Sequence, residues 1–236
     1  MTDSLVIPAR FNGPPGSANG GYTCGLLAGR LDAGVAEVSL RAPPPLERPL
    51  RVVGDGDGLE LRDADTLVAT AAPGELSLEA PEPVSPERAR AASDAGREHW
   101  SANHPFRTCV VCGPERDPGD GLRLFPGELA ERRFAVEWTP DESVADGRGH
   151  VCPECVWAAL DCPTSAPVAN FGAGPPLVLA SLTARLDAPV KIGEPHVIVS
   201  WPLAVEGRKR HAAAALFDSE GQLLCASRAL WIELRR

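Results

Sequence analysis

The distribution of apolar and polar residues divides the chain into two similar halves. Each half begins with a segment rich in Ala, Gly and Leu that carries few charges, at residues 20–31 and 153–163. A helix of this kind is typically buried, and its small side chains allow close approach to a sheet. Strand-like segments follow each helix, separated by a proline-marked bend and a polar turn. The pattern predicts a tandem repeat in which one buried helix leads into three strands.

The strands are predicted from residue type and alternation. Residues 196–205 are rich in β-branched and aromatic side chains, which favour strands. Asp218 and Gly221 have the chemistry of a hairpin turn. In residues 224–234, both alternating sets of side chains are mostly apolar, as in a strand covered on both faces. We therefore expect antiparallel sheets that pack on the buried helices.

One buried helix wrapped by a strongly bent antiparallel sheet is the hotdog layout. Two such units in tandem resemble the double-hotdog acyl-CoA thioesterases and thioesterase-like proteins. The resemblance rests on element order and on the small-residue helices. It implies an α+β protein with a tandem (double) hotdog fold, in which two bent antiparallel sheets each wrap around a central helix. Residues 1–80 form the predicted N-terminal half, 81–121 a connector, and 122–236 the C-terminal half.

The connector contains a predicted surface helix. Ser85 is a suitable N-cap, and Pro86 fits the first helical position. Charged residues are frequent over the next three turns, so we expect most of this helix to face solvent. A turn-rich segment with a close pair of cysteines follows it.

Composition narrows the classes of partner. The chain has 236 residues and a formal net charge of −9, which argues against binding nucleic acid or anionic membranes. The first residues have no basic or long apolar segment, which argues against a signal peptide. The longest uncharged run, residues 162–184, contains four prolines and does not suit a spanning helix. We expect a soluble cytoplasmic protein that keeps its cysteines reduced.

Four cysteines form two C-x-x-C pairs, Cys109 with Cys112 and Cys152 with Cys155. Two such pairs have the spacing of a four-thiolate zinc site, which is closed and structural. Gly113 gives the first pair the backbone freedom that a metal-binding knuckle needs. We therefore predict a structural zinc ion on these four residues.

Other interpretations of the cysteines remain open. His104 or His150 is able to replace one thiolate ligand. One alternative is that the four cysteines are unligated small hydrophobic residues, and a lesser one is a disulfide between the two pairs. The remaining cysteines, Cys24, Cys162 and Cys225, are predicted to be core thiols.

Candidate binding residues precede the first buried helix. The segment Asn19–Tyr22, NGGY, looks like the HGG-type helix entry of hotdog thioesterases. That resemblance implies that Asn19 donates a hydrogen bond to the thioester. Gly20 and Gly21 would let the backbone approach the substrate, and Tyr22 would bond an acyl or pantetheine group. The alternative is an Asn N-cap followed by glycines needed for packing.

Two carboxylates accompany the second buried helix. Glu154, in its first turn, is a candidate general base or nucleophile, although a carboxylate there also simply complements the helix dipole. Asp161 ends the helix, where the dipole disfavours a negative charge, so another contact must hold it. It either caps the next turn or faces a pocket as a catalytic residue.

These features predict a protein that binds and hydrolyses acyl-CoA or other acyl thioesters without an organic cofactor. One alternative is a non-catalytic hotdog protein that binds an acyl chain or another apolar small molecule. Another is an interaction protein whose zinc-bound connector contacts a partner. Because hotdog units commonly pair through their sheets, we also predict a homodimer.

Overall fold

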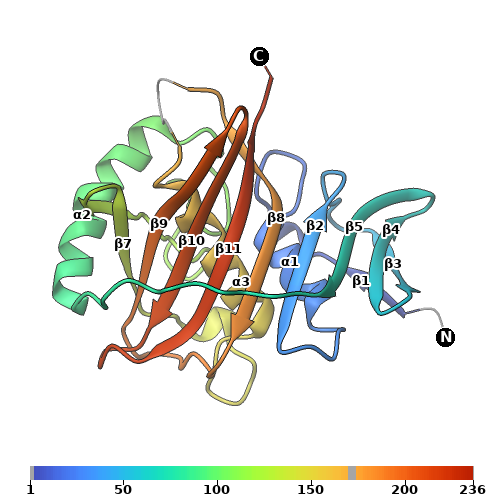
Figure 1. Ribbon diagram of the computed structural model, residues 1–236, viewed down its shortest axis with the longest axis horizontal. Helices are drawn as coiled ribbons and strands as arrows, with labels where there is room; N and C mark the ends of the chain where they lie inside the picture. Colours follow the sequence, from blue (N-terminus) through green and yellow to red (C-terminus); the bar gives the residue numbers. More distant parts are fainter. Residues whose placement is uncertain (1–2, 170–173, 236) are drawn as a thin grey trace.

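The computed structural model describes residues 3–169 and 174–235. The described strands form one antiparallel sheet in the order β1-β3-β4-β5-β2-β8-β11-β10-β9-β7-β6 (Figure 1). Their bounds are β1 Asp3–Val6, β2 Val35–Leu40, β3 Pro49–Asp55, β4 Gly58–Asp63, β5 Thr66–Pro73, β6 Gly127–Ala130, β7 Arg133–Trp138, β8 Leu177–Leu186, β9 His196–Glu206, β10 Lys209–Phe217 and β11 Leu223–Glu233. The predicted α+β double-hotdog class is confirmed.

The two predicted sheets join edge to edge. Strand β2 of the first half pairs antiparallel with β8 of the second, with Val38 opposite Leu182. On either side of this junction the order is the same in each half: β2-β5-β4-β3-β1 on one side and β8-β11-β10-β9-β7 on the other. The internal repeat seen in the sequence is therefore a structural repeat around the β2–β8 pair.

Each of the two buried helices is followed by four strands among the described residues, not the three predicted. The additional strands arise from tight hairpins, β3–β4 around Gly56 and β9–β10 around Gly207, where both glycines have positive φ. Strand β10 was not predicted as a separate strand because its centre is a run of alanines, Ala212–Ala215, and alanine is a weak strand former. This run is fully buried between β9 and β11, so packing overrides propensity.

The two buried helices, α1 (Gly20–Ala28) and α3 (Pro153–Asp161), pack against each other in antiparallel orientation. A Cβ atom added at Gly21 would lie 2.4 Å from Asp161 Cβ, and one added at Gly25 would lie 2.5 Å from Glu154 Cα. These two glycines, one turn apart, allow the helix axes to approach closely. The N-terminus of α1 is thereby placed against the C-terminal end of α3.

The connector helix α2 (Pro86–Asn103) packs on β6 and β7 with one side buried. As predicted, it starts at Pro86 after Ser85, whose side chain accepts a hydrogen bond from the Arg88 amide. The extended segment 74–84 that leads to α2 crosses the outer face of β8–β11 (Figure 1). Ala80 and Val84 of this segment pack against a buried cluster from β9 and β10.

Short 3₁₀ helices complete the secondary structure: η1 (Ala9–Phe11), η2 (Glu142–Val144) and η3 (Cys162–Ser165). Among residues 3–169 and 174–235, no helix is both long enough and apolar enough to cross a membrane.

Candidate functional site

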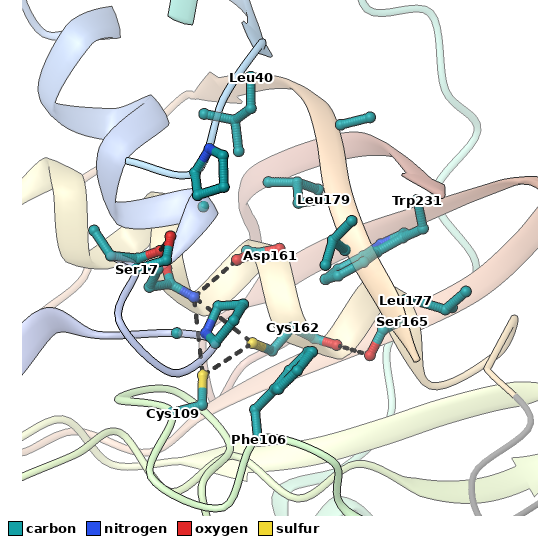
Figure 2. A pocket seen from close by; sticks show the side chains of 18 of the residues that line it. Ser17, Leu40, Phe106, Cys109, Asp161, Cys162, Ser165, Leu177, Leu179 and Trp231 are labelled. Carbon is teal, nitrogen blue, oxygen red and sulfur yellow. Dashed lines mark hydrogen bonds between the residues drawn. The ribbon is translucent and has the colours of Figure 1, made fainter. Parts of the chain in front are cut away.

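A cavity of about 510 Å³ opens where the N-terminus of α1 meets the C-terminus of α3. Its apolar wall is formed by Leu40, Leu177, Leu179 and Trp231 (Figure 2). Its polar end is formed by Asn19, Asp161 and the cysteines described below. The cavity thus offers an apolar surface beside a group of hydrogen-bonding and titratable side chains, the arrangement typical of small-molecule sites.

Asp161 is the buried acid of this site, and its side chain is only 1 % exposed. Its Oδ2 accepts hydrogen bonds from the Gly21 amide at 2.9 Å and from Asn19 Nδ2 at 3.0 Å. Its Oδ1 has no hydrogen-bond partner among the described residues. The carboxylate is thus fixed through one oxygen by the N-terminus of α1, and its other oxygen is buried, without a partner in the described part of the chain, in a residue that lines the cavity.

The surroundings of Asp161 have opposing effects on its charge. Burial raises the pKa of Asp161 to about 7, and the charge of Cys109 acts in the same direction. The hydrogen bonds from Gly21 and Asn19 favour the carboxylate and lower the pKa. The carboxylate that the sequence placed at the unfavourable end of α3 is therefore held at the favourable N-terminal end of α1.

The residues of the NGGY segment make different contacts in the structure. Asn19 is the N-cap of α1: its Oδ1 accepts from the Tyr22 amide at 2.8 Å, while its Nδ2 donates to Asp161. Gly20 lines the cavity. Gly21 contacts α3, so its lack of a side chain serves helix packing. The N-cap interpretation of Asn19 is therefore confirmed. Asn19 also lines the cavity, and a hydrogen bond from it to a thioester stays a prediction.

Tyr22 and Glu154 do not line the cavity. The Tyr22 ring is buried and stacks on Phe11, with ring centroids 3.8 Å apart. Burial raises the pKa of the Tyr22 hydroxyl above its ordinary value. Glu154 is half-buried in the first turn of α3, two turns from Asp161 and against Gly25. The structure therefore separates the two carboxylates selected from the sequence, and only Asp161 reaches the cavity.

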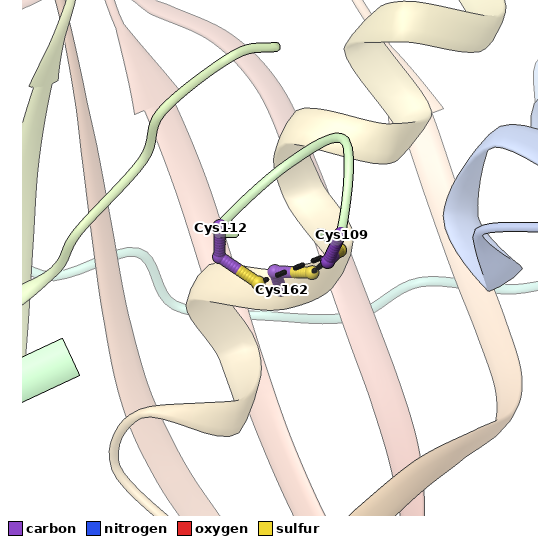
Figure 3. A group of neighbouring side chains, drawn as sticks. All are labelled: Cys109, Cys112 and Cys162. Atoms are coloured by element: carbon purple, nitrogen blue, oxygen red, sulfur yellow. Dashed lines mark hydrogen bonds between the residues drawn. The ribbon is translucent and has the colours of Figure 1, made fainter. Parts of the chain in front are cut away.

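Three thiols meet at the polar end of the cavity: Cys109, Cys112 and Cys162 (Figure 3). Their sulfur atoms all lie within 4.8 Å of one another, with 3.6 Å between Cys109 and Cys112 and 3.8 Å between Cys109 and Cys162. This buried group is able to hold a metal ion.

The composition of this group differs from the predicted zinc site. Cys109 and Cys112 belong to both sets, but Cys162 takes part where Cys152 and Cys155 were predicted. Cys152 and Cys155 lie at the N-terminal end of α3, whereas Cys162 directly follows its C-terminal end. The structure thus brings the connector knuckle to the opposite end of the helix.

The pKa values of the three thiols shift in different directions. Hydrogen bonds from Cys112 and Cys162, together with the backbone amides of Val111 and Cys112, hold the pKa of Cys109 well below its usual value. Burial raises the pKa of Cys112, and the contact with Cys109 raises that of Cys162. Within this group, the pKa is lowered for Cys109 and raised for Cys112 and Cys162.

Cys162 is buried in the core, as predicted, and it also joins the group of three thiols, which its spacing along the chain does not indicate. It is buried like a core residue, and it is 50 residues from the nearest member of the C-x-x-C knuckle. The available signal was its position next to Asp161, since a residue that follows a cavity-facing carboxylate lies at the same end of the helix.

The solved structures that match nearly the whole chain include the following three. A TesB protein of Mycobacterium avium subspecies paratuberculosis has 16 % identity and a TM-score of 0.58, with 98 % of this chain and 91 % of that chain covered. A candidate thioesterase II of Thermobifida fusca has 15 % identity and a TM-score of 0.59, with 98 % and 92 % covered. A candidate oleoyl thioesterase of Lactobacillus plantarum has 11 % identity and a TM-score of 0.57, with 100 % and 96 % covered.

Comparison with protein-family models and with curated proteins gives no match. At these identities, the structural similarities show the fold and not the reaction. The chain has the double-hotdog fold of thioesterase II and TesB-type structures over nearly its whole length, which confirms the resemblance inferred from the sequence.

Proposed function

We propose that this protein binds acyl thioesters in the cavity between α1 and α3 and hydrolyses them. The observation that carries the proposal is the buried Asp161 carboxylate in the cavity lining, with Oδ2 fixed by Gly21 and Asn19 and Oδ1 without a partner among the described residues. A carboxylate held in this way is suited to take a proton from a water molecule. The fold shared with TesB and candidate thioesterase II structures supports the same class of substrate.

In the proposed reaction, Asp161 accepts a proton from water while the water oxygen attacks the thioester carbonyl. The resulting tetrahedral oxyanion collapses, the carbon–sulfur bond breaks, and the thiolate leaves with the proton returned from Asp161. The products are a carboxylic acid and a free thiol. No covalent bond to the protein forms in this scheme.

The N-terminus of α1 supplies the stabilisation of the oxyanion. Among its first-turn amides, that of Gly21 donates to Asp161 and that of Tyr22 donates to Asn19. Gly20 lines the cavity, and its amide is the donor that we assign to the thioester oxygen. A backbone N–H at a helix N-terminus stabilises developing negative charge effectively because it is already oriented.

The apolar wall receives the acyl chain. Leu177 and Leu179 of β8 and Trp231 of β11 lie along one side of the cavity, away from the polar end. An acyl chain against this wall would direct its thioester toward Asp161. The similarity to a candidate oleoyl thioesterase makes long unsaturated chains a useful member of the substrate set.

The test is hydrolysis of a panel of acyl-CoAs from short to long, including oleoyl and aromatic members. Free CoA is followed by chromatography, because the seven cysteines of the protein would react with a thiol dye. Turnover of one class supports the proposal. Saturable binding without turnover would instead identify a non-catalytic hotdog protein. If the protein neither binds nor hydrolyses CoA or carrier-protein thioesters, the proposal is contradicted.

A bulky residue at the cavity wall is expected to weaken substrate binding. Ala42 is half-buried in the segment that lines the cavity. We expect Ala42→Trp to raise the KM for the preferred acyl thioester by about tenfold or more, since a large ring displaces the acyl group. Ala130→Trp, on the exposed side of edge strand β6, is the matched control. An unchanged KM in a folded Ala42→Trp protein would argue against this cavity.

A further inference from the structure

We infer that Cys109, Cys112 and Cys162 bind a Zn²⁺ ion as three thiolates, and that the fourth coordination position faces the cavity and takes water or a small thiol. The closed four-thiolate site expected from the sequence has Cys152 and Cys155 as its second ligand pair. In the inferred site, Cys162 and a ligand from the cavity take their place. The inference does not depend on the proposed hydrolysis, because a metal site can be present whether or not thioesters are turned over.

The first argument is the spacing of the sulfur atoms. Three sulfurs placed about 2.3 Å from a tetrahedral Zn²⁺ ion are about 3.8 Å from one another. The observed separations are 3.6 Å for Cys109–Cys112 and 3.8 Å for Cys109–Cys162. Figure 3 shows the sulfur atoms of the three residues drawn together between the connector loop and the end of α3. The thiols are therefore close to the positions that a single zinc ion requires.

The second argument is the shape of the connector loop. The Gly113 amide donates a hydrogen bond to the Cys109 carbonyl at 2.8 Å, which closes a tight turn around the C-x-x-C pair. A Cβ atom added at Gly113 would lie 2.5 Å from the Cys109 carbonyl oxygen, so glycine is required there. A tight turn of this kind brings Cys109 and Cys112 to the same side of the loop, with their sulfur atoms 3.6 Å apart.

The third argument is the set of side-chain N–H groups around the sulfurs. Asn19 Nδ2 lies 4.0 Å from Cys109 Sγ and 3.9 Å from Cys162 Sγ. His104 Nε2 lies 3.2 Å from Cys112 Sγ. Because His104 Nδ1 accepts a hydrogen bond from the Phe106 amide, the proton of the neutral ring is on Nε2, which then donates to Cys112.

Each of the three sulfurs therefore has a side-chain N–H directed at it. Such outer contacts orient metal ligands and offset the excess negative charge of a site with three thiolates and one divalent cation. His104 contacts only one of the three sulfurs and does not belong to the group within 4.8 Å, which makes it an outer contact. In the inferred site, His104 is therefore a hydrogen-bond donor to Cys112, whereas on the sequence it is considered as a metal ligand.

The open position follows from the location of the site. All three cysteines line the cavity, whereas a structural zinc site is enclosed by four protein ligands. Among the described residues, no fourth His, Cys, Asp or Glu ligand atom joins the group. The fourth ligand must then come from the cavity. Zinc with sulfur ligands favours water or a further thiolate in that position.

The first test uses the unmodified full chain, produced with added zinc sulfate and purified without chelator. Elemental analysis is expected to give about one zinc per chain. X-ray absorption at the zinc edge is expected to show three sulfur neighbours and one oxygen or nitrogen neighbour. Addition of 2-mercaptoethanol should convert this to four sulfur neighbours. A zinc content well below one, or four sulfur neighbours before the thiol is added, would overturn the inference.

Variants identify the third ligand. Cys162→Ala is expected to lower zinc content at least tenfold, whereas Cys155→Ala should retain it, with Cys225→Ala as a matched buried-thiol control. Circular dichroism reports whether each variant folds. Zinc retained by folded Cys162→Ala, or lost from folded Cys155→Ala, contradicts the assignment. If Cys162→Ala does not fold, the neighbour count in the unmodified protein still decides the question.

Discussion

Replacing Asp161 by asparagine is expected to lower kcat/KM for the preferred acyl thioester by about 10²- to 10⁴-fold. Asparagine has the same shape and can still accept the hydrogen bond from the Gly21 amide. It cannot accept the proton of the attacking water, so the loss should lie mainly in kcat. The measurement is steady-state hydrolysis with free CoA followed by chromatography.

Glu154→Gln is the matched control for this substitution. Glu154 lies on the same helix but outside the cavity, so we expect nearly unchanged turnover. Thermal denaturation of both variants shows whether either change disturbs the helix pair. Wild-type turnover in Asp161→Asn, or a large loss in a stable Glu154→Gln, would contradict the assignment of Asp161 as the proton acceptor.

Replacing Gly25 by alanine is expected to cause a large loss of stability. The new Cβ atom would lie 2.5 Å from Glu154 Cα and 2.8 Å from Trp157 Cβ, so α1 and α3 must move apart. Overpacking of this kind costs about 3 kcal/mol, and the better helix propensity of alanine returns about 1 kcal/mol. The net loss of about 2 kcal/mol corresponds to a fall in Tm of roughly 4–8 °C for a chain of this size.

Gly34→Ala makes the same chemical change in open space. Gly34 is exposed, and a Cβ atom there would have no neighbour within 4 Å. We expect its Tm to stay within about 2 °C of the wild-type value. Differential scanning calorimetry of the two variants compares them directly, and equal Tm values would show that the helices do not need glycine at position 25.

The fold could be predicted from the sequence because its signals are local. The small-residue segments and the alternation of residues 224–234 each report how one element is buried. Strand β10 gave no such signal, since the Ala212–Ala215 run becomes a strand only through its neighbours. Which strands join the halves is likewise a long-range property, and the sequence contains no signal for the β2–β8 pair.

The site was predictable only in part, for a related reason. Asp161 was noticeable because a carboxylate ending an apolar helix conflicts with the helix dipole. The group that resolves this conflict, the Gly21 amide, is 140 residues away along the chain. The cysteine pairs were misassigned because spacing shows which thiols are neighbours along the chain. It does not show which end of α3 the connector reaches, and the two ends of this helix are about 13 Å apart.

The proposed zinc site and the proposed thioester site share one cavity, so their tests inform each other without being interchangeable. Asn19 contacts both Asp161 and the thiols. Zinc without turnover would point to a metal-dependent role for the cavity, and turnover without zinc would leave the thiols as part of its wall. Pairing of two copies remains a prediction.

The β2–β8 junction affects synthesis on the ribosome. Strand β2 ends at Leu40, and its partner β8 is complete only at Leu186. At ordinary translation rates, the nascent chain spends roughly 7–30 s with that strand edge unpaired. During this time α1 also lacks α3, and its glycine-lined surface is uncovered. The nascent first half is therefore the stage at which this chain is most prone to aggregate and most in need of a chaperone.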